Sequence, residues 1–168
     1  MCERAGAVDV EAFRDVYLRV YAEPPYHEDE AAADRFAGQL REHAALPGFS
    51  ATTVTGDDGV LGGFAYGVAY DDGWWHPRAT APPPAWVGHP LYYVWELLLA
   101  PELRGRGHGR GLLDLLLADR GEPCAVLAAS TGAPAYRMYL RWGWTKIGGL
   151  AAPPAGVDLL TRRLDATP

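Results

Sequence analysis

The sequence has few of the features that mark secreted, membrane-bound or metal-dependent proteins. It contains two cysteines, Cys2 and Cys124, and we expect no disulfide between them. None of its apolar runs approaches the ~20 residues that a membrane helix needs. Residues 1–6 lack the apolar core of a signal peptide, and the five histidines show no spacing typical of zinc ligands. We therefore expect a cytoplasmic protein with no metal and no membrane partner.

Excess positive charge is also missing. The formal net charge is −6, which argues against a nucleic-acid partner, because nucleic-acid-binding proteins usually carry a basic face. Hydrophobic residues make up 49% of the chain and charged residues 21%, a balance typical of a globular protein. The 168 residues are enough for a domain with its own core. We therefore predict a single domain over residues 1–168.

Arginine and glycine are concentrated in one short stretch. Residues 104–111 read RGRGHGRG, between an apolar strand that ends near Leu99 and a leucine-rich helix. Glycines let the backbone approach a ligand closely and adopt a positive φ. Successive N–H groups and the start of the following helix then present positive charge to an anion. This stretch is typical of a phosphate-binding loop.

The spacing within the loop narrows the choice of phosphate ligand. A Walker A loop needs Gly-Lys-Ser/Thr, and this loop contains no lysine. The dinucleotide pattern G-x-G-x-x-G fails in both registers, since its last position falls on Arg110 or Leu112. What remains is Arg104-x-x-Gly107-x-Gly109. With its flanking strand and helix, this segment resembles the coenzyme A pyrophosphate loop of the GNAT superfamily of N-acetyltransferases.

A second segment carries the same resemblance. In residues 135–144, Ala135 precedes Tyr139 by four positions, and a Gly143-Trp144 pair follows, as in the fourth-helix signature of that superfamily. The resemblance is closest over residues 50–150. It implies an acyl-CoA N-acyltransferase domain with an α/β fold, in which helices flank a mixed, largely antiparallel central sheet. It also implies acetyl-CoA as co-substrate and is compatible with a homodimer.

Periodicity and chain breakers give the expected elements. Asp9 suits the N-cap of a first helix, and Pro24 ends it. The family usually begins with a strand, for which Ala7 and Val8 are the only candidates here, so we expect that strand to be very short or absent. The pattern predicts helices over 9–22, 28–45, 109–119 and 133–142, and strands over 49–55, 60–70, 91–99, 124–129, 144–150 and 157–163.

Two residues are candidates for the catalytic steps. Glu96 lies on the apolar strand 91–99, where desolvation raises the pKa of a carboxyl group, and alternation places it on one face with Leu98. The resemblance implies that it acts as general base, directly or through water. The alternative is a structural carboxylate bonded to its neighbours. Tyr139 matches the tyrosine that protonates the departing thiolate in similar enzymes, with a core aromatic as the alternative.

The coenzyme site follows from the resemblance. The main chain of Leu97–Leu99 is expected to pair with the pantetheine arm, and the amides of residues 104–109 to hold the pyrophosphate. Arg104 matches the Gln/Arg position of the motif, Arg106 and Arg110 contact phosphate or face solvent, and we expect His108 to be exposed. Gly132 stands where similar enzymes often have Asn, so that contact is either missing or supplied by Ser130 or Thr131. The expected coenzyme-binding residues are Leu97, Leu98, Leu99, Arg104, Gly105, Arg106, Gly107, His108, Gly109, Arg110, Ser130 and Tyr136, the last as a wall of the site or as packing.

The acceptor site is expected beside the first two helices and after the second strand. Carboxylates there lie beside aromatic residues, an arrangement that suits a cationic amine. The alternative is that the acids only favour a helix start and a solvated turn. The candidate acceptor-binding residues are Glu23, Tyr26, Glu28, Trp74, Trp75 and Tyr92.

Three functions are therefore in view. The first is transfer of an acetyl group from acetyl-CoA to a primary amine of a small, cationic molecule. The second is an acyl-CoA-binding sensor or regulatory module without turnover. The third is a protein or peptide N-acetyltransferase.

Overall fold

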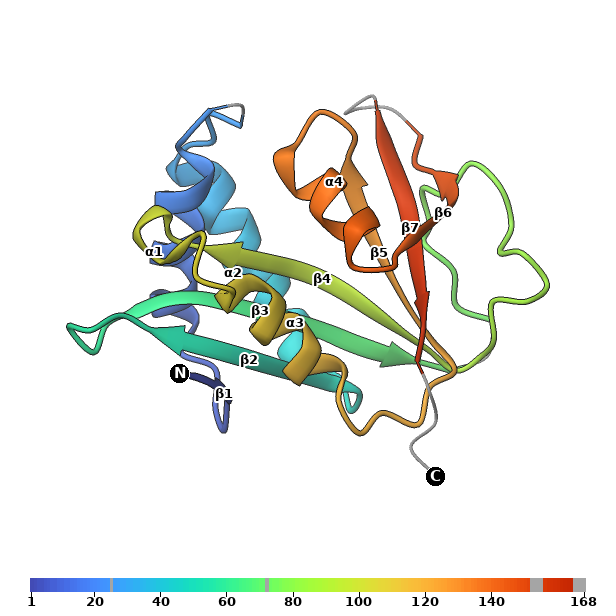
Figure 1. Cartoon of the computed structure of the whole chain (residues 1–168), viewed down its shortest axis with the longest axis horizontal. Helices are drawn as coiled ribbons and strands as arrows, with labels where there is room; N and C mark the ends of the chain where they lie inside the picture. Colours follow the sequence, from blue (N-terminus) through green and yellow to red (C-terminus); the bar gives the residue numbers. More distant parts are fainter. Residues whose placement is uncertain (25, 72, 152–155, 165–168) are drawn as a thin grey trace. The chain divides into compact units, whose positions relative to one another are not determined.

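The computed structural model describes residues 1–24, 26–71, 73–151 and 156–164 (Figure 1). The strands among them follow the hydrogen-bonded order β1-β2-β3-β4-β5-β7-β6. Pairs β1–β2, β2–β3, β5–β7 and β6–β7 are antiparallel and β4–β5 is parallel. The elements are β1 (Cys2–Arg4), α1 (Val10–Tyr21), α2 (Glu30–Ala44), β2 (Phe49–Thr55), β3 (Leu61–Tyr70), β4 (Leu91–Leu99), a 3-10 turn (Pro101–Leu103), α3 (His108–Leu117), β5 (Cys124–Ser130), α4 (Pro134–Arg141), β6 (Thr145–Gly149) and β7 (Val157–Arg163).

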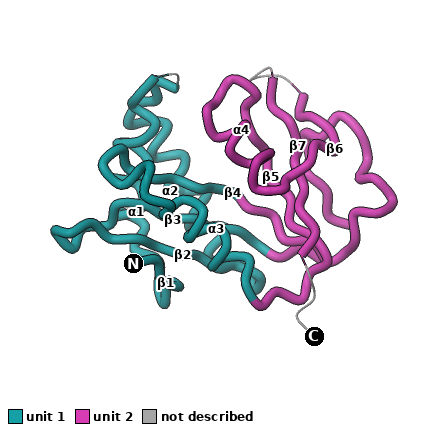
Figure 2. The backbone as a smooth tube through the Cα atoms, in the orientation of Figure 1, with its two compact units in different colours: residues 1–68, 95–118 teal, residues 69–94, 119–168 magenta. Residues whose placement is uncertain are grey.

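The chain divides into two units (Figure 2). Unit 1 contains residues 1–68 and 95–118, and unit 2 contains residues 69–94 and 119–168. Strand β4 passes from one to the other, so that Leu91–Val94 belong to unit 2 and Trp95–Leu99 to unit 1.

In unit 1, helices α1 and α2 pack together over one face of the strands. Their buried side chains, among them Phe13 and Phe36, join Phe64 of β3 and Leu98 of β4 in one apolar cluster. The ring centroids of Phe13 and Phe64 lie 4.2 Å apart. Helix α3 packs on the opposite face. Ala51 of β2 points into the cluster, so its neighbour Thr52 points to the other face, where its Oγ1 donates a 2.9 Å hydrogen bond to the carbonyl of Leu112.

Carboxylate caps fix where these helices begin. The side chain of Asp9 accepts hydrogen bonds from the amides of Glu11 and Ala12, and Asp29 accepts one from Ala32. Helix α1 therefore starts at Val10 and α2 at Glu30.

In unit 2, the first part of β4 forms a parallel ladder with β5, from Tyr92 opposite Ala125 to Val94 opposite Leu127. Helix α4 packs on β5. The long connection 71–90 is tied down where the amide of Thr80 donates to the carbonyl of Gly149, at 2.9 Å.

The first strand differs from its expected position. A very short strand is present, but it is Cys2–Arg4 and not Ala7 or Val8. It pairs antiparallel with β2, with Cys2 opposite Val54. Residues 6–8 instead lead into the Asp9 cap. A three-residue edge strand that contains Glu and Arg shows no alternation in the sequence, which is why the pattern gave no sign of it.

Candidate active site

Glu96 is a carboxyl group in a strongly perturbed environment of unit 1. Its Oε2 accepts a 3.1 Å hydrogen bond from the hydroxyl of Tyr21 on α1. Burial raises the pKa of Glu96 to about 8; the Tyr21 hydrogen bond opposes this shift and the nearby charge of Glu28 adds to it. A carboxyl group whose pKa lies near the working pH of an enzyme is suited to act as a general base.

Strand β4 departs from strict alternation just before Glu96. Leu98 lies in the cluster under α1 and α2, as expected for the face that carries Glu96. Trp95 should then point to the other face. Its ring nevertheless packs against the same cluster, and its centroid is 4.4 Å from that of His43 on α2. Two consecutive residues of β4 therefore reach the α1–α2 side, which seats Glu96 against Tyr21.

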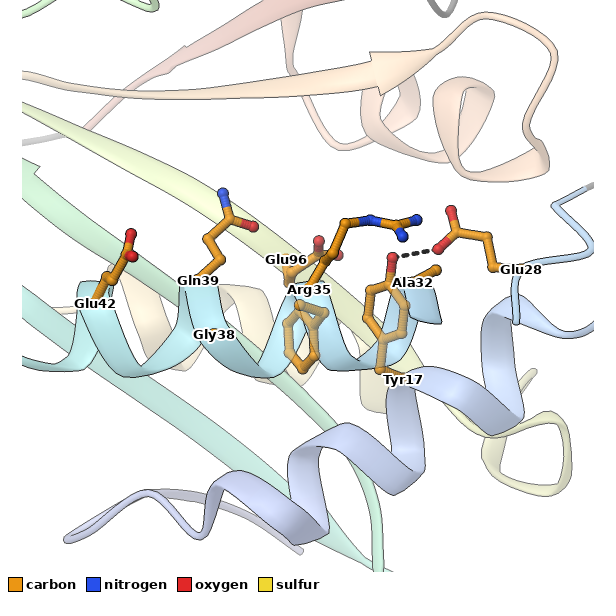
Figure 3. A pocket seen from close by; sticks show the side chains of 9 residues that line it. Tyr17, Glu28, Ala32, Arg35, Gly38, Gln39, Glu42 and Glu96 are labelled. Carbon is orange, nitrogen blue, oxygen red and sulfur yellow. Dashed lines mark hydrogen bonds between the residues drawn. The ribbon is translucent and has the colours of Figure 1, made fainter. Parts of the chain in front are cut away.

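Glu96 opens into a pocket of about 620 Å³ beside helix α2 (Figure 3). The hydroxyl of Tyr17, from α1, donates a hydrogen bond to Glu28 on its wall. The pocket is lined by Tyr17, Glu28, Ala32, Arg35, Phe36, Gly38, Gln39, Glu42 and Glu96.

The three predicted acceptor residues of unit 1 are placed differently with respect to this carboxylate. Glu28 lines the pocket. Tyr26 sets its ring edge-on to Tyr21, with centroids 4.7 Å apart, and burial followed by the charge of Glu96 raises its pKa. Glu23 instead forms an ion pair with Arg104, at 3.0 Å. The structure thus brings Glu28 and Tyr26 to the Glu96 region and engages Glu23 elsewhere.

The predicted phosphate loop has the backbone that its glycines suggest. Gly105 and Gly107 have φ values of +75° and +83°, and Gly107 is the left-handed N-cap of α3. The first hydrogen bond of the helix runs from the amide of Gly111 to the carbonyl of Gly107. The backbone amides of residues 108–110, in the first turn of α3, have no partner within the helix and are available for an anion.

The loop side chains differ in their contacts. Arg104 donates from Nε to the carbonyl of Leu99, at 3.0 Å. Arg110 forms an exposed pair with Asp114, at 3.2 Å, and Arg106 is exposed. His108, predicted to be exposed, is half-buried; it begins α3, and its carbonyl accepts a 3.7 Å hydrogen bond from Sγ of Cys2.

Unit 2 holds the candidate residues of helix α4. Tyr139 is buried, and its ring lies edge-on to Trp142 and Trp144. The Tyr136 hydroxyl donates a 2.7 Å hydrogen bond to Asp158, and this bond to a carboxylate raises the pKa of Tyr136. The nearby candidate Ser130 ends β5, and its carbonyl accepts a hydrogen bond from Ala133 at the start of α4.

The remaining acceptor candidates also lie in unit 2. Trp74 stacks on Tyr70, with ring centroids 3.9 Å apart. Trp75 donates from Nε1 to the carbonyl of Ala81, at 2.9 Å. Tyr92 is fully buried, and the guanidinium carbon of Arg120 lies 3.3 Å from the centre of its ring. Tyr92 thus packs as a core residue of this unit.

Sequence reasoning missed the wall that α2 contributes to the pocket. Arg35, Gln39 and Glu42 recur at spacings of four and three, which indicates one polar stripe of a helix. That signal was present, but a polar stripe on a helix is usually a solvated face. Only the packing of α2 beside Glu96 turns it into a pocket wall.

Comparison with known proteins identifies the class. The profile of the GNAT acetyltransferase family matches residues 10–144, so the chain belongs to this family. Comparison with curated proteins gave no significant match. Within the described residues, no helix is long and apolar enough to cross a membrane, and no group of His, Cys, Asp or Glu is arranged to hold a metal ion.

Solved structures share this fold over nearly the whole chain. A GNAT-family protein from Desulfovibrio desulfuricans is 23% identical, with a TM-score of 0.65 and 99% of each chain covered. The ribosomal-protein-S18-alanine N-acetyltransferase from Escherichia coli is 16% identical, with a TM-score of 0.64, covering 100% of this chain and 97% of its own. The PaiA N-acetyltransferase from Thermoplasma acidophilum, solved in complex with coenzyme A, is 13% identical, with a TM-score of 0.62, covering 97% and 99%.

Proposed function

We propose that this protein transfers the acetyl group of acetyl-CoA to a primary amine of a small, cationic molecule, in the cytoplasm. The observation that carries the proposal is Glu96, a carboxyl group with a pKa of about 8 at an open pocket. An amine must lose a proton before it can attack, and a base of this pKa accepts that proton near neutral pH. A bound ammonium ion would itself favour the ionised form of Glu96.

In the proposed reaction, Glu96 takes a proton from the ammonium group, directly or through one water. The free nitrogen attacks the thioester carbonyl carbon. The nitrogen of this adduct then releases its second proton to water, and the C–S bond breaks as the amide forms. Tyr139 gives its hydroxyl proton to the departing thiolate and takes a proton back from water. Holding the two substrates together contributes much of the remaining acceleration.

The start of α3 supports the choice of co-substrate. Gly107 caps the helix in a left-handed conformation and leaves the following amides directed at an anion, which suits a pyrophosphate. The ladder between β4 and β5 runs from Tyr92 to Val94, and Leu97–Leu99 lie beyond it along the strand. We assign their main chain to the pantetheine arm. Ser130 and Tyr136 are assigned to the coenzyme from unit 2.

The charge of the pocket supports a cationic acceptor. Two carboxylates, on Glu28 and Glu42, line it together with the titrating Glu96 and one guanidinium group, on Arg35. We assign Glu28 and Tyr26 to acceptor binding, with Trp74 and Trp75 from unit 2 as further candidates. One structural neighbour is named for an alanine of a ribosomal protein, so peptides belong in the test beside small amines.

The test is acetyl-CoA consumption, read as thiol release, against polyamines, aminoglycosides, amino acids and peptides. The same panel is run on Glu96→Gln and on the control Glu102→Gln, which neutralises an exposed carboxylate outside the pocket. We expect turnover with a cationic small amine, lost in Glu96→Gln with coenzyme affinity unchanged by calorimetry. Coenzyme binding without turnover on any amine would indicate a sensor, and turnover restricted to peptides a protein acetyltransferase.

A further inference from the structure

The pocket beside Glu96 extends along helix α2 well past the base. Its wall follows one stripe of the helix from Ala32 through Arg35 and Gln39 to Glu42. At 1.5 Å per residue, Arg35 and Glu42 are separated by about 10 Å along the axis. Figure 3 shows Glu28 and Tyr17 toward one end of this stripe and Glu42 at the other. A single amino group at Glu96 leaves the Glu42 end unfilled.

Gly38 lies in this distal part and is unusual for its place in a helix. It is in the interior of α2, where glycine is less favourable than alanine. A Cβ atom built at Gly38 would have no atom within 4 Å, so close packing does not demand a glycine there. Its φ is not positive either. The missing side chain instead leaves space along the pocket wall.

Glu42 supplies charge at the end of that space. At the near end of the pocket, Glu28 accepts a hydrogen bond from Tyr17, and Glu96 accepts one from Tyr21. Glu42 has an exposed side chain and makes no ion pair within the described residues. Its neighbour Gln39, one turn earlier, adds a neutral hydrogen-bonding group to the same wall.

We propose that the acceptor is an elongated diamine or polyamine, and that Gly38 and Glu42 determine this specificity. The reacting amine lies at Glu96, the connecting chain passes over Gly38, and the distal ammonium group pairs with Glu42. This inference rests on the proposed function, because it extends the same pocket. It assigns specificity to two residues of α2 that take no part in the proton transfers.

The test compares linear alkanediamines with monoamines of matched length. In Glu42→Gln we expect KM for diamines to rise about fivefold, the upper range for an exposed ion pair, and KM for monoamines to rise clearly less. Gly38→Leu should lower kcat/KM for long diamines about tenfold and spare the smallest amines. Ala31→Leu is the matched control, since Ala31 is exposed on α2 and does not line the pocket.

Calorimetry of diamine binding in the presence of coenzyme A separates the two proposals. Weaker diamine binding in Glu42→Gln, with monoamine binding less affected, supports the proposed specificity even if no amine is turned over. The lack of turnover would overturn only the proposed function. Equal effects of Glu42→Gln on diamines and monoamines would overturn the inference and leave the acetyltransferase assignment intact. Gly38→Ala checks the fold, because better helix propensity should raise its Tm.

Discussion

The hydroxyl of Tyr21 donates a 3.1 Å hydrogen bond to the carboxyl group of Glu96. This bond joins the last turn of α1 to the strand that crosses both units. A hydroxyl donor stabilises the ionised carboxylate, and it therefore limits how far burial can raise the pKa. Tyr21 is in this way a positioning residue for the proposed base.

Replacing Tyr21 should move the pH profile of the reaction. We expect kcat/KM of the wild type to rise with pH through an apparent pKa of about 8, as Glu96 ionises. In Tyr21→Phe the apparent pKa should be higher, and activity at pH 7 should fall roughly tenfold, since a hydrogen bond to a charged group contributes about 1.5–3 kcal/mol. Tyr17→Phe is the control, because that hydroxyl bonds Glu28. An unmoved profile in Tyr21→Phe would contradict this role.

Glu96 should also make stability depend on pH. Its folded pKa of about 8 lies above the ordinary value of 4.5, so between these values the folded state holds a proton that the unfolded chain has lost. Stability is then greatest below about pH 4.5 and decreases as pH rises toward 8. Glu96→Gln lacks this titration. The Tm of Glu96→Gln minus that of the wild type should therefore increase from pH 5 to pH 8 in thermal unfolding, and a constant difference would argue against the raised pKa.

Gly107 should be required for coenzyme binding more than for folding. Its φ of +83° disfavours any other residue by about 1–2 kcal/mol, yet a Cβ there would meet no atom within 4 Å. We expect Gly107→Val to remain folded and to lose at least tenfold in affinity for coenzyme A, measured by calorimetry. Gly6→Ala is the matched control at a glycine without positive φ. Unchanged affinity in Gly107→Val would remove the loop from the coenzyme site.

Tyr139 and Tyr136 should separate in their effects. Tyr139→Phe keeps the ring beside Trp142 and Trp144 and removes the proposed acid, so kcat should fall more than the KM for acetyl-CoA rises. Tyr136→Phe loses the hydrogen bond to Asp158 and should destabilise the fold by about 1 kcal/mol. Steady-state kinetics and denaturant unfolding measure the two effects. Equal kcat in Tyr139→Phe and wild type at every pH would exclude Tyr139 as the acid.

The elements that periodicity determines were predictable. Strand β4 (Leu91–Leu99) and β2 (Phe49–Thr55) were expected at their observed bounds, and the helices within two residues at either end, since apolar patterns and caps define both. Strand β1 was predicted at the wrong residues, because its position is determined by pairing with β2 and not by a pattern in its own side chains.

The site was predictable in its chemistry and less so in its shape. Glu96 was singled out because a carboxylate on an apolar strand is costly. The contribution of Tyr21 and the wall formed by Gly38 and Glu42 depend on how α1 and α2 pack around β4. Side chains that are distant in sequence meet there, and the irregularity at Trp95 that helps seat Glu96 leaves no mark on the residue pattern.

Arg104 has a consequence for how the two substrates influence one another. Its guanidinium group donates a hydrogen bond to the carbonyl of Leu99, at the end of β4, and forms an ion pair with Glu23, just after α1. The backbone of Arg104 begins the loop before α3. Arg104 therefore lies in the loop proposed to bind coenzyme A and contacts the segment proposed to receive the amine. We therefore expect the affinities for the two substrates to be thermodynamically linked, in which case each alters the binding of the other by the same factor.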